Sequence, residues 1–513
     1  MCIRDRADAA KDKKSEEPEK GAMILLGPGP NRIGQGSGFD HNAVQAIKGM
    51  GDRGIEAVVI NPNPASVLSM ASAAARCYLE PLDSECVREI YNRERAAGLM
   101  PQFGGQGALD LAAALAAEGL PVAGTAPETF ALARDRASFR SQVRKMGIPQ
   151  PKWAVVADEA VAAEMAEQIG YPLMLRWGER VEIAYDGPSL AGVLAEAGPE
   201  EAAPVDLLME QFLDNALEAE VDAVSDGTGV FIPTIMEHIE LAGIHSGDSA
   251  CVIPAVGIPP KLIHTIEDYA LQLAQSLNIK GCFNVQFAVY RNTVYLLEVK
   301  PLAARSVALV SKVCHAPLAR MGARLSAGDS LADIDRTVLT PSHFGVKEAV
   351  FSYHMISDAD PILGPGMRST GGVLGLAETF GQAFSKSQAG TGLALPTKGA
   401  VLFTILEEDK PAALEPARLF TALGFKLLAT PGTCQFFSEH GIEAKPVRKL
   451  GYGRPDLVDA IKSGQVQLVV NTPGGRHGAH DNAYIRQTAV RYKVLNITTT
   501  AMAIAAARGI AAQ

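Results

Sequence analysis

The sequence lacks three patterns that would each assign it to a particular class of protein. Its seven cysteines include no Cys-x-x-Cys pair and no zinc-ligand spacing, which favours reduced thiols over a disulfide framework. It contains no run of about 18 apolar residues and no apolar stretch of a signal peptide near its amino terminus. These absences predict a cytoplasmic chain without a membrane span.

Positive charge is also in short supply, because 47 lysines and arginines face 57 aspartates and glutamates, for a formal net charge of −10. This balance argues against a general nucleic-acid binder, although an acidic protein can still hold a basic pocket for a phosphorylated small molecule. Apolar residues make up 47% and charged residues 20%, which are ordinary values for a globular protein. We therefore expect proteins and metabolites as partners, with no nucleic acid and no membrane.

The length of 513 residues predicts roughly three domains, because it exceeds what one hydrophobic core supports. Residues 1–20 are highly charged and predict a disordered leader or linker. Strands and helices alternate over 21–127, which predicts a parallel sheet with right-handed crossovers. A basic helix is expected at 127–147, where the character of the sequence changes, and residues 128–392 are α+β in character. Residues 393–513 repeat the alternating pattern. The predicted fold class is therefore α/β and α+β multidomain.

Two glycine-rich turns follow predicted strands of the first domain. The turn "GPGPNRIGQG" (27–36) joins a strand to a helix, whose first backbone N–H groups attract anions. The turn "QFGGQGAL" (102–109) lies at another strand end, on the same expected edge of the sheet. Phosphate binding is one interpretation, and close packing of loop against helix is the other.

A dense group of polar residues lies in "MEHIELAGIHSGDSAC" (236–251). Around two glycines it gathers Glu237, His238, Glu240, His245, Ser246 and Asp248. The two histidines lack the (i, i+4) spacing of zinc ligands on a helix. Contacts to a nucleotide or a substrate are therefore favoured over a metal site.

The segment "NVQFAVYRNTVYLLEVKP" (284–301) predicts two alternating strands joined by a short turn, which form a β-hairpin. The hairpin would put Gln286 and Glu298 on neighbouring strands, where an amide oxygen and a carboxylate can hold Mg²⁺ against ATP phosphates. An ordinary edge hairpin with an exposed glutamate explains the same spacing. Lys300, two residues beyond Glu298, is an unexpected cation for a metal site.

Together these segments resemble the C-terminal half of the carbamoyl-phosphate synthetase large subunit, over nearly the whole chain from about residue 21 to 500. "GPGPNRIGQGSGFDHNAVQA" resembles its second pre-ATP-grasp motif, "IMEHIELAGIHSGDSAC" its ATP-grasp signature and "LGPGMRSTGGVLG" a late ATP-grasp motif. The resemblance implies a Rossmann-like pre-ATP-grasp domain (21–127), an ATP-grasp domain (128–392) and an allosteric domain of the methylglyoxal-synthase type (393–513).

The resemblance also implies an activity and its partners. In this family the C-terminal half uses ATP, with Mg²⁺ or Mn²⁺, to phosphorylate carbamate, and the carbamoyl phosphate serves pyrimidine and arginine synthesis. An amino-terminal synthetase half makes carboxyphosphate from bicarbonate, and a glutaminase small subunit supplies ammonia. An oligomer and a small-molecule effector of the nucleotide or ornithine type are expected as well.

The same resemblance assigns the residues of a catalytic and nucleotide site. Arg136 and Arg176 would contact phosphates, and Arg305 would meet the substrate or the transferring phosphate, so that Arg176 and Arg305 are the expected catalytic residues. Gln286 and Glu298 would hold the metal ion and face the nucleotide. The nucleotide site would also be lined by Leu213, Glu218, Gly243, Ile244, His245 and Ser246.

Two effector sites follow from the resemblance. The phosphate of a nucleotide-type effector would meet Lys398, Thr430, Thr433, Lys449 and Asn471. An ornithine-type effector, which only some members of the family use, would meet Glu240, Asp248 and Glu348.

The chain departs from the family pattern at the phosphate end of the site. Where the family reads Glu-x-Asn-Pro-Arg, Lys300 replaces the asparagine and Leu302 the arginine, so an oxygen ligand and a cation are lost. The segment after Arg176 is shorter by about five residues and lacks the paired glycines that close over ATP. Gln211 and Pro473 replace a common histidine and threonine.

Three functions are compatible with these departures. The chain can be a working synthetase half or a catalytically silent homologue with a regulatory or scaffolding role. The third alternative is an ATP-grasp ligase that acts on a different carboxylate-like acceptor.

Overall fold

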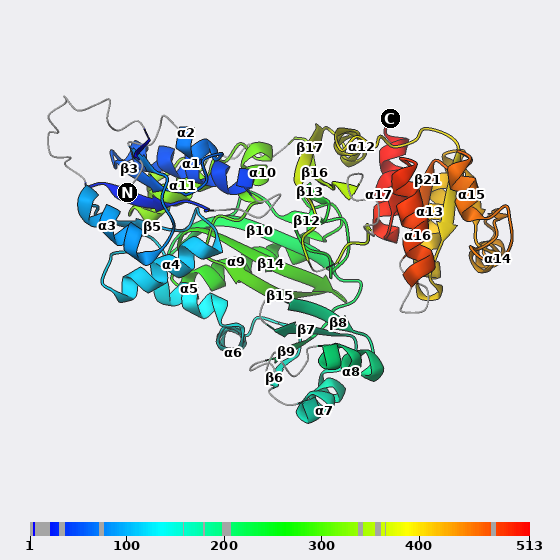
Figure 1. Cartoon of the computed structure of the whole chain (residues 1–513), viewed down its shortest axis with the longest axis horizontal. Coiled ribbons are helices and arrows are strands. Elements are labelled where there is room, and N and C mark those ends of the chain that lie inside the picture. The colour runs from blue at the N-terminus through cyan, green and yellow to red at the C-terminus, as the bar shows by residue number, and fades with distance from the viewer. Residues whose placement is uncertain are drawn as a thin grey trace. The chain divides into compact units, whose positions relative to one another are not determined.

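The computed structural model describes residues 4–5, 21–29, 36–70, 76–156, 159–177, 180–196, 207–336, 342–353, 361–364, 366–472 and 479–513. The chain divides into two compact units (Figure 1). The first consists of Met1–Met236 and Ala255–Pro341, and the second of Glu237–Pro254 and Ser342–Gln513. The mixed α/β and α+β fold class predicted from the sequence is confirmed.

The first unit begins with a sheet in the order β1-β4-β3-β2-β5. Four of its strands are parallel, as their alternation with helices predicts: β2 (Met23–Leu26), β3 (Ala57–Ile60), β4 (Arg76–Tyr78) and β5 (Gly98–Met100). The intervening helices are α1 (Gly36–Asp52), α2 (Val67–Met70), α3 (Ser84–Glu94) and α4 (Gln106–Ala117). Ile24, Val58 and Leu99 are fully buried. The strands of a parallel sheet are covered on both faces, which explains why their residues are apolar throughout.

Part of the predicted leader lies in this sheet. Arg4–Asp5 form β1, which pairs antiparallel with β4. Residues 1–3 and 6–20 lie outside the described residues, as do residues 30–35 of the first glycine-rich turn.

The basic segment 127–147 forms two helices, so the prediction of a single helix is wrong. Helix α5 (Pro127–Arg134) ends at Asp135, and α6 (Arg136–Met146) begins directly after it. The Asp135 carboxylate accepts a hydrogen bond from the Ser138 backbone N–H at 3.0 Å. An aspartate that caps a helix takes an extended backbone conformation, which ends the preceding helix. This break places Arg136 at the first position of α6.

A second sheet of the first unit has the order β6-β9-β7-β8. Its strands are β6 (Trp153–Val156), β7 (Leu173–Trp177), β8 (Arg180–Ala184) and β9 (Leu207–Gln211). Helices α7 (Glu159–Ile169) and α8 (Gly187–Glu196) cover the same face of this sheet (Figure 1). Ala162, Ala166 and Leu190 of these helices pack against the strand residues Leu173 and Leu175.

The second unit contains two groups of strands. Strands β12 (Met236–His238), β13 (Cys251–Ile253), β16 (Phe344–Val350) and β17 (Gly371–Ala377) pair antiparallel in that order, next to helix α12 (Phe380–Gly390). A parallel sheet follows in the order β20-β19-β18-β21-β22. Its strands are β18 (Ala400–Thr404), β19 (Lys426–Ala429), β20 (Lys445–Pro446), β21 (Leu468–Asn471) and β22 (Leu495–Ile497).

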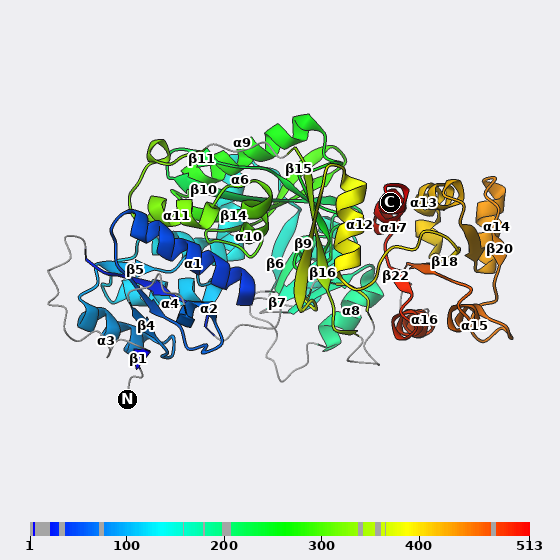
Figure 2. The ribbon, with the colours of Figure 1, turned by 90° about the horizontal axis from the view of Figure 1, so that it is seen from above.

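Helices cover both faces of this parallel sheet (Figure 2). The helices involved are α13 (Lys410–Ala422), α14 (Pro431–Glu439), α15 (Leu457–Lys462), α16 (Ala479–Arg491) and α17 (Thr500–Ala511). Val401 and Phe403 of β18 pack with Phe420 of α13 and Ala506 of α17 on one face. Leu402, which points the other way, packs with residues of α15 and α16. The alternation along β18 thus builds two apolar layers, as in a doubly wound fold.

In the described part of the chain Cys282, Cys314 and Cys434 are free thiols. None of the helices in the described ranges is long and apolar enough to cross a membrane.

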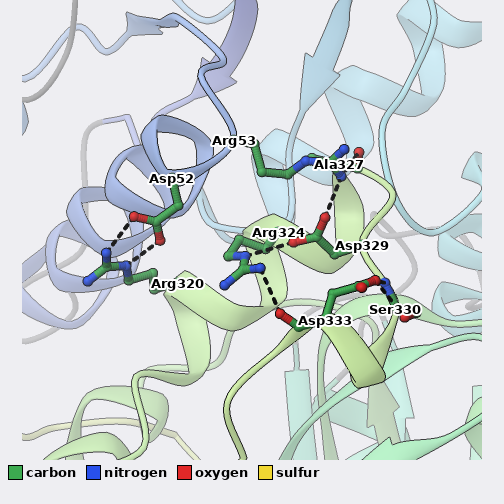
Figure 3. A network of polar contacts seen from close by, with 8 residues as sticks. All are labelled: Asp52, Arg53, Arg320, Arg324, Ala327, Asp329, Ser330 and Asp333. Atoms are coloured by element: carbon green, nitrogen blue, oxygen red, sulfur yellow. Dashed lines mark hydrogen bonds and ion pairs between the residues drawn. The ribbon is translucent and has the colours of Figure 1, made fainter.

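Ion pairs join α1 to α11 (Leu318–Ser326) and to the turn that follows α11 (Figure 3). Arg320 donates from both Nε and Nη2 to the Asp52 carboxylate, at 2.6 and 2.5 Å. Asp329 accepts from Arg53 at 2.9 Å and from Arg324 at 2.7 Å. The two helices are close because Gly49 faces the carbonyl oxygen of Arg320, with which a Cβ would collide.

We expect Gly49→Ala to destabilise the first unit by about 1–3 kcal/mol, because the added methyl group must displace backbone of α11. Gly51→Ala is the matched control in the same helix, since nothing lies within 4 Å of the Cβ it would add. That control should gain up to about 1 kcal/mol from the higher helix propensity of alanine. Urea unfolding of both variants measures the difference, and equal stabilities would contradict the close approach of the helices.

Candidate functional site

Six polar side chains share one face of the strands β15 (Thr293–Lys300), β14 (Lys280–Tyr290) and β10 (Leu217–Asp226), which pair antiparallel in that order. We call this group the polar face. Its members form two rows across the strands: Glu220, Gln286 and Glu298 in one, and Asp222, Asn284 and Lys300 in the other. Directly opposed residues of antiparallel strands present their side chains on the same side. The predicted hairpin and the neighbouring positions of Gln286 and Glu298 are confirmed.

The opposite face of these strands is apolar. Val221, Val285 and Val299 alternate with the polar residues and pack in one core cluster with Ile266 and Leu273 of α9 (Pro260–Ser276). Because the pleat alternates with a period of two, this core fixes which residues point to the polar face.

The buried part of the polar face is a group of carboxylates held by an amide. Asn284 Nδ2 donates to Glu220 Oε1 at 2.7 Å and to Asp222 Oδ1 at 2.9 Å, and the Ser306 hydroxyl donates to Glu220 at 3.0 Å. Asp222 is only 1% exposed. Burial and the charge of Glu220 raise the pKa of Asp222 to about 7. Its Oδ2 accepts no hydrogen bond from the residues that the structure describes.

The open part of the polar face carries an ion pair. Lys300 Nζ lies 2.8 Å from Glu298 Oε2, and the two side chains are 37% and 36% exposed. Removal from water raises the pKa of Glu298, but attraction to Lys300 and Arg136 outweighs this effect and lowers it to about 2. The Lys300 ammonium therefore forms an ion pair with Glu298, one of the two predicted metal ligands.

Two of the predicted phosphate-binding arginines lie near this ion pair. Arg136 and Arg176 both act on the charge of Glu298. Arg176 Nε lies 3.0 Å from Glu210 Oε2, and the buried Arg140 contacts the other carboxylate oxygen of Glu210. Burial lowers the pKa of Arg176, and Glu210 offsets part of that shift. The structure therefore brings together Arg136, Arg176 and Glu298, while Glu210 positions Arg176.

The hairpin that carries Arg176 is short. Trp177 of β7 pairs with Arg180 of β8, so only two residues connect the strands. This two-residue connection agrees with the shortened segment read from the sequence.

Leu302 does not face the polar residues. It is 5% exposed and packs with Leu109 and Phe130, where the family pattern has a phosphate-binding arginine. The adjoining backbone is held by Asn42, whose Nδ2 donates to the carbonyls of Ala303 and Ala304 at 3.1 and 2.9 Å. Arg305 follows, and its Cβ lies 3.3 Å from the position that a Cβ of Gly38 would take.

The second glycine-rich turn has a packing function in this unit. Gln102 is fully buried and donates to the Pro301 carbonyl at 3.1 Å and to Thr125 Oγ1 at 3.1 Å. A Cβ at Gly104 would collide with the Leu26 carbonyl oxygen. The close-packing interpretation of this turn therefore accounts for Gln102 and Gly104.

The expected nucleotide-lining residues fall in both units. Leu213 is buried just after β9, and Glu218 lies on β10 opposite Ala288. Gly243, Ile244, His245 and Ser246 belong to the second unit, where all four are half-buried. His245 Nδ1 accepts the Gly247 backbone N–H at 3.0 Å, which fixes the ring. The (i, i+7) pair His238 and His245 is part of no metal cluster, since the described residues contain no group of three or more His, Cys, Asp or Glu that could hold a metal ion.

The acidic residues of segment 236–251 are structurally engaged within the second unit. Glu240 accepts from the Ser249 hydroxyl at 2.8 Å and the Ala250 backbone N–H at 2.7 Å. Asp248 accepts from the backbone N–H groups of Arg368 and Ser369 at 2.7 and 2.9 Å. These hydrogen bonds hold both carboxylates in fixed directions.

A cavity of about 390 Å³ in the second unit brings together the three residues expected for an ornithine-type effector. Glu240, Asp248 and Glu348 line it together with Gln388, Lys493 and Asn496. Burial and the charge of Glu240 raise the pKa of Glu348 to about 8, although Gln388 donates to its carboxylate at 2.7 Å. The buried Asn496 Oδ1 accepts no hydrogen bond within the described part of the chain. Apolar side chains make up much of the lining, but among its charged groups three carboxyl groups face one lysine, so the cavity suits a cationic ligand with an apolar part.

The residues expected to bind an effector phosphate meet only in part. Thr430, Thr433 and Asn471 are buried at the carboxyl edge of the parallel sheet, where β19 and β21 end. Thr430 Oγ1 donates to Thr433 Oγ1 at 3.2 Å, and Asn471 Oδ1 accepts from the buried Arg486 at 2.8 Å. Lys449 follows β20 on this edge.

Lys398 does not join this group, because it precedes the amino end of β18 at the other edge of the sheet. Lys410 lies near the group instead, with its side chain only 9% exposed. Its Nζ is 3.6 Å from the position that a Cβ of Gly432 would take, beside Thr430 and Thr433. Sequence reasoning missed Lys410, which begins the helix after β18; the starts of such helices are places where anions bind. Pro473 lies outside the described residues.

Comparisons with known proteins agree with this architecture. Three domain-family models match along the chain: "Carbamoyl phosphate synthase preATP-grasp domain" at residues 19–132, "Carbamoyl-phosphate synthase L chain, ATP binding domain" at 135–334, and "MGS-like domain" at 412–498. A protein of Aquifex aeolicus named "Carbamoyl phosphate synthase large chain, C-terminal section" is 40% identical over 500 residues, which cover 93% of each chain. The chain belongs to the carbamoyl phosphate synthase large chain family.

Members of the family differ in length. The carbamoyl phosphate synthase large chain of Acidobacterium capsulatum is 42% identical over 517 residues, covering 98% of this chain but 47% of that relative. The chain thus spans about half the length of the full large chains it matches. Among solved structures, the biotin carboxylase domain of the Hydrogenobacter thermophilus 2-oxoglutarate carboxylase covers 72% of this chain, with a TM-score of 0.56 and 16% identity. That likeness supports the ATP-grasp fold alone.

Membership of this ATP-grasp family implies the use of ATP and a divalent metal ion. The donor atoms of the polar face fit one such ion, because Gln286 and Glu298 offer an amide and a carboxylate oxygen side by side. The next position offers none, since the Lys300 ammonium is a donor only. A divalent ion about 4 Å from that ammonium would be repelled by roughly 8 kcal/mol at an effective dielectric of about 20.

We expect Glu348→Gln to stabilise the second unit in a manner that depends on pH. Unfolded Glu348 ionises near its ordinary pKa of 4.5, whereas the folded cavity holds its proton up to about 8. The wild-type protein therefore loses stability as the pH rises between these values, and the amide variant does not. Thermal unfolding at pH 5 should show little difference, and at pH 8 the variant should melt at least about 2 °C higher.

Glu378→Gln is the control for this measurement, because Glu378 is exposed in the same unit. A pH-independent difference between Glu348→Gln and the wild-type protein would contradict the raised pKa of Glu348.

Proposed function

We propose that this chain is the half of a carbamoyl phosphate synthase that phosphorylates carbamate, with ATP as phosphate donor. A carbamate oxygen attacks the γ-phosphorus of ATP, the new O–P bond forms as the bond to ADP breaks, and carbamoyl phosphate and ADP result. The observation that carries the proposal is the placement of Gln286 and Glu298 beside Arg136 and Arg176. Relatives 40% identical over nearly their whole length are named as the C-terminal section of this enzyme, which supports it further.

Each residue near the polar face has a part in this proposal. Phosphoryl transfer depends mainly on positioning and on neutralising charge. Arg136 and Arg176 would bind phosphate oxygens, with Arg176 oriented by Glu210. Arg305 would contact the carbamate or the transferring phosphoryl group. Gln286 and Glu298 would hold Mg²⁺ or Mn²⁺, which would supply positive charge to neutralise the nucleotide phosphates.

The resemblance assigns further residues to the lining of the nucleotide's base and sugar, and each unit carries some of them. In the first unit these are Leu213 and Glu218. In the second they are Gly243, Ile244, His245 and Ser246.

The proposed reaction requires partners. The carbamate would come from an amino-terminal synthetase half on another polypeptide or on a longer form of this one, and a glutaminase small subunit would supply the ammonia. The product would serve pyrimidine and arginine synthesis in the cytoplasm, in an oligomeric enzyme. A domain division at residues 21–127, 128–392 and 393–513 belongs to the same proposal.

We also propose regulation through the second unit. The acidic cavity suits an ornithine-type cation, because Glu240, Asp248 and Glu348 face a single space of about 390 Å³. A nucleotide-type effector would place its phosphate at Thr430 and Thr433, near the start of α14. Lys410 supports that site more strongly than Lys398 because of its position at the same edge.

The activity is tested in the reverse direction. Purified chain supplied with carbamoyl phosphate, ADP and Mg²⁺ should form ATP. Arg176→Met should reduce the rate at least about a hundredfold, because a preorganised phosphate contact is lost. Arg93→Met, an exposed arginine of α3, should leave the rate unchanged.

An absence of ATP in this assay, not restored by Lys300→Asn with Leu302→Arg, would contradict the proposal. If ADP still bound under those conditions, the chain would be the catalytically silent regulatory homologue instead.

Effector binding is measured by calorimetry with L-ornithine as the probe. Glu348→Gln should weaken binding at least about tenfold, because the ligand ammonium loses a buried charged partner. Binding at pH 7 should also release a proton, since a cation in the cavity drives ionisation of Glu348. Heats in buffers of different ionisation enthalpy measure this release, and the Glu348→Gln variant should lose it. Glu378→Gln, with wild-type heats, is the control; no ornithine heat with any variant would contradict the proposed ligand class.

A further inference from the structure

Two departures from the family pattern at the end of β15 compensate each other in charge. Leu302 stands where the pattern has an arginine, and Lys300 where it has an asparagine. The strand end therefore keeps one cation and moves it two residues toward the polar face. The buried place of Leu302 between Leu109 and Phe130 explains why no charge is kept at the second position.

The geometry of the relocated cation is that of a metal substitute. Lys300 Nζ lies 2.8 Å from Glu298 Oε2, the distance of a strong charge-assisted hydrogen bond. Asp222 of the same row also attracts it. The Lys300 ammonium thus contacts a residue two positions earlier on its own strand, Glu298, which is paired with Gln286 on the neighbouring strand.

The ammonium also has donors to spare. A lysine carries three N–H donors, and Glu298 occupies one of them. The side chain is 37% exposed, so the remaining donors are accessible, and the charges of Arg136 and Arg176 act on the same carboxylate.

We propose that Lys300 is a resident cation of the nucleotide site: its ammonium takes one oxygen of Glu298, leaves oxygens for a single divalent ion, and binds nucleotide phosphates directly. This inference rests on the proposed function only in that a nucleotide binds at the polar face. It adds that nucleotide binding depends weakly on metal, and that Lys300 excludes a second ion.

The test counts metal ions by electron paramagnetic resonance of free Mn²⁺, titrated into the full chain in the presence of excess ADP. The wild-type chain should bind one more Mn²⁺ than ADP in buffer alone accounts for, and Lys300→Asn should bind two. Lys261→Asn, which changes an exposed lysine of α9, should match the wild-type count. Lys300→Gln, whose amide also offers an oxygen, provides a second variant should Lys300→Asn fold poorly.

Calorimetry with ADP in EDTA gives an independent readout. Metal-free ADP should bind the wild-type chain at least about tenfold more tightly than it binds Lys300→Asn, because the variant has lost the resident cation. Addition of Mg²⁺ should tighten binding to the variant by a larger factor than to the wild type.

Equal Mn²⁺ counts in the wild type and both Lys300 variants would overturn the inference, and so would equal ADP affinities in EDTA or no ADP binding by any of the chains. Neither readout requires turnover. A chain that binds one Mn²⁺ through Lys300-dependent exclusion but forms no ATP from carbamoyl phosphate would refute the proposed reaction and leave this inference standing.

Discussion

The alternation of side chains along β10, β14 and β15 is the constraint on which the rest of the site depends. One side of these strands packs on α9, and the other carries every charged and amide group of the polar face. A slip of one residue in the register would bury Glu298 and Lys300 in the apolar core and place valines on the polar face. The apolar core of the first unit therefore fixes the chemistry of the site as firmly as any hydrogen bond within it.

Electrostatics then divides the polar face into a closed and an open part. Asn284 holds Glu220 and Asp222 together in a buried position, which keeps the pKa of Asp222 high. The outer pair, Glu298 and Lys300, has the opposite balance, because cations surround the carboxylate and lower its pKa. Two acidic groups on the same face of the sheet thus differ in pKa through burial and neighbouring charges alone.

Much of this could be predicted from the sequence where the signal is local. The period of two in "NVQFAVYRNTVYLLEVKP" gave the hairpin and the pairing of Gln286 with Glu298, and alternating strands and helices gave the parallel sheets. The break at Asp135 was missed, because the flanking segments are both helix-forming and a capping aspartate looks like any other charged residue on a helix.

Other features depend on residues far apart in the chain. Glu210, Arg140 and Arg176 lie on three different elements, so no spacing in the sequence predicts the contacts of Glu210 with the two arginines. Lys398 and Lys410 both lie close to β18 in the sequence, but of the two only Lys410 lies at the carboxyl edge of the sheet. The sequence does not show whether the Lys300 side chain points into water or toward Glu298. That depends on its rotamer and on the charges around it in the folded structure.

The acidic cavity has a consequence for modularity. Its lining runs from Glu240 and Glu348, in the segment predicted as ATP-grasp, to Lys493 and Asn496 in the last 120 or so residues of the chain. The boundary expected near residue 393 therefore passes through the binding space and not beside it. A terminal domain exchanged between relatives would carry only part of the cavity lining, so the residues on the two sides of this boundary constrain one another's replacement.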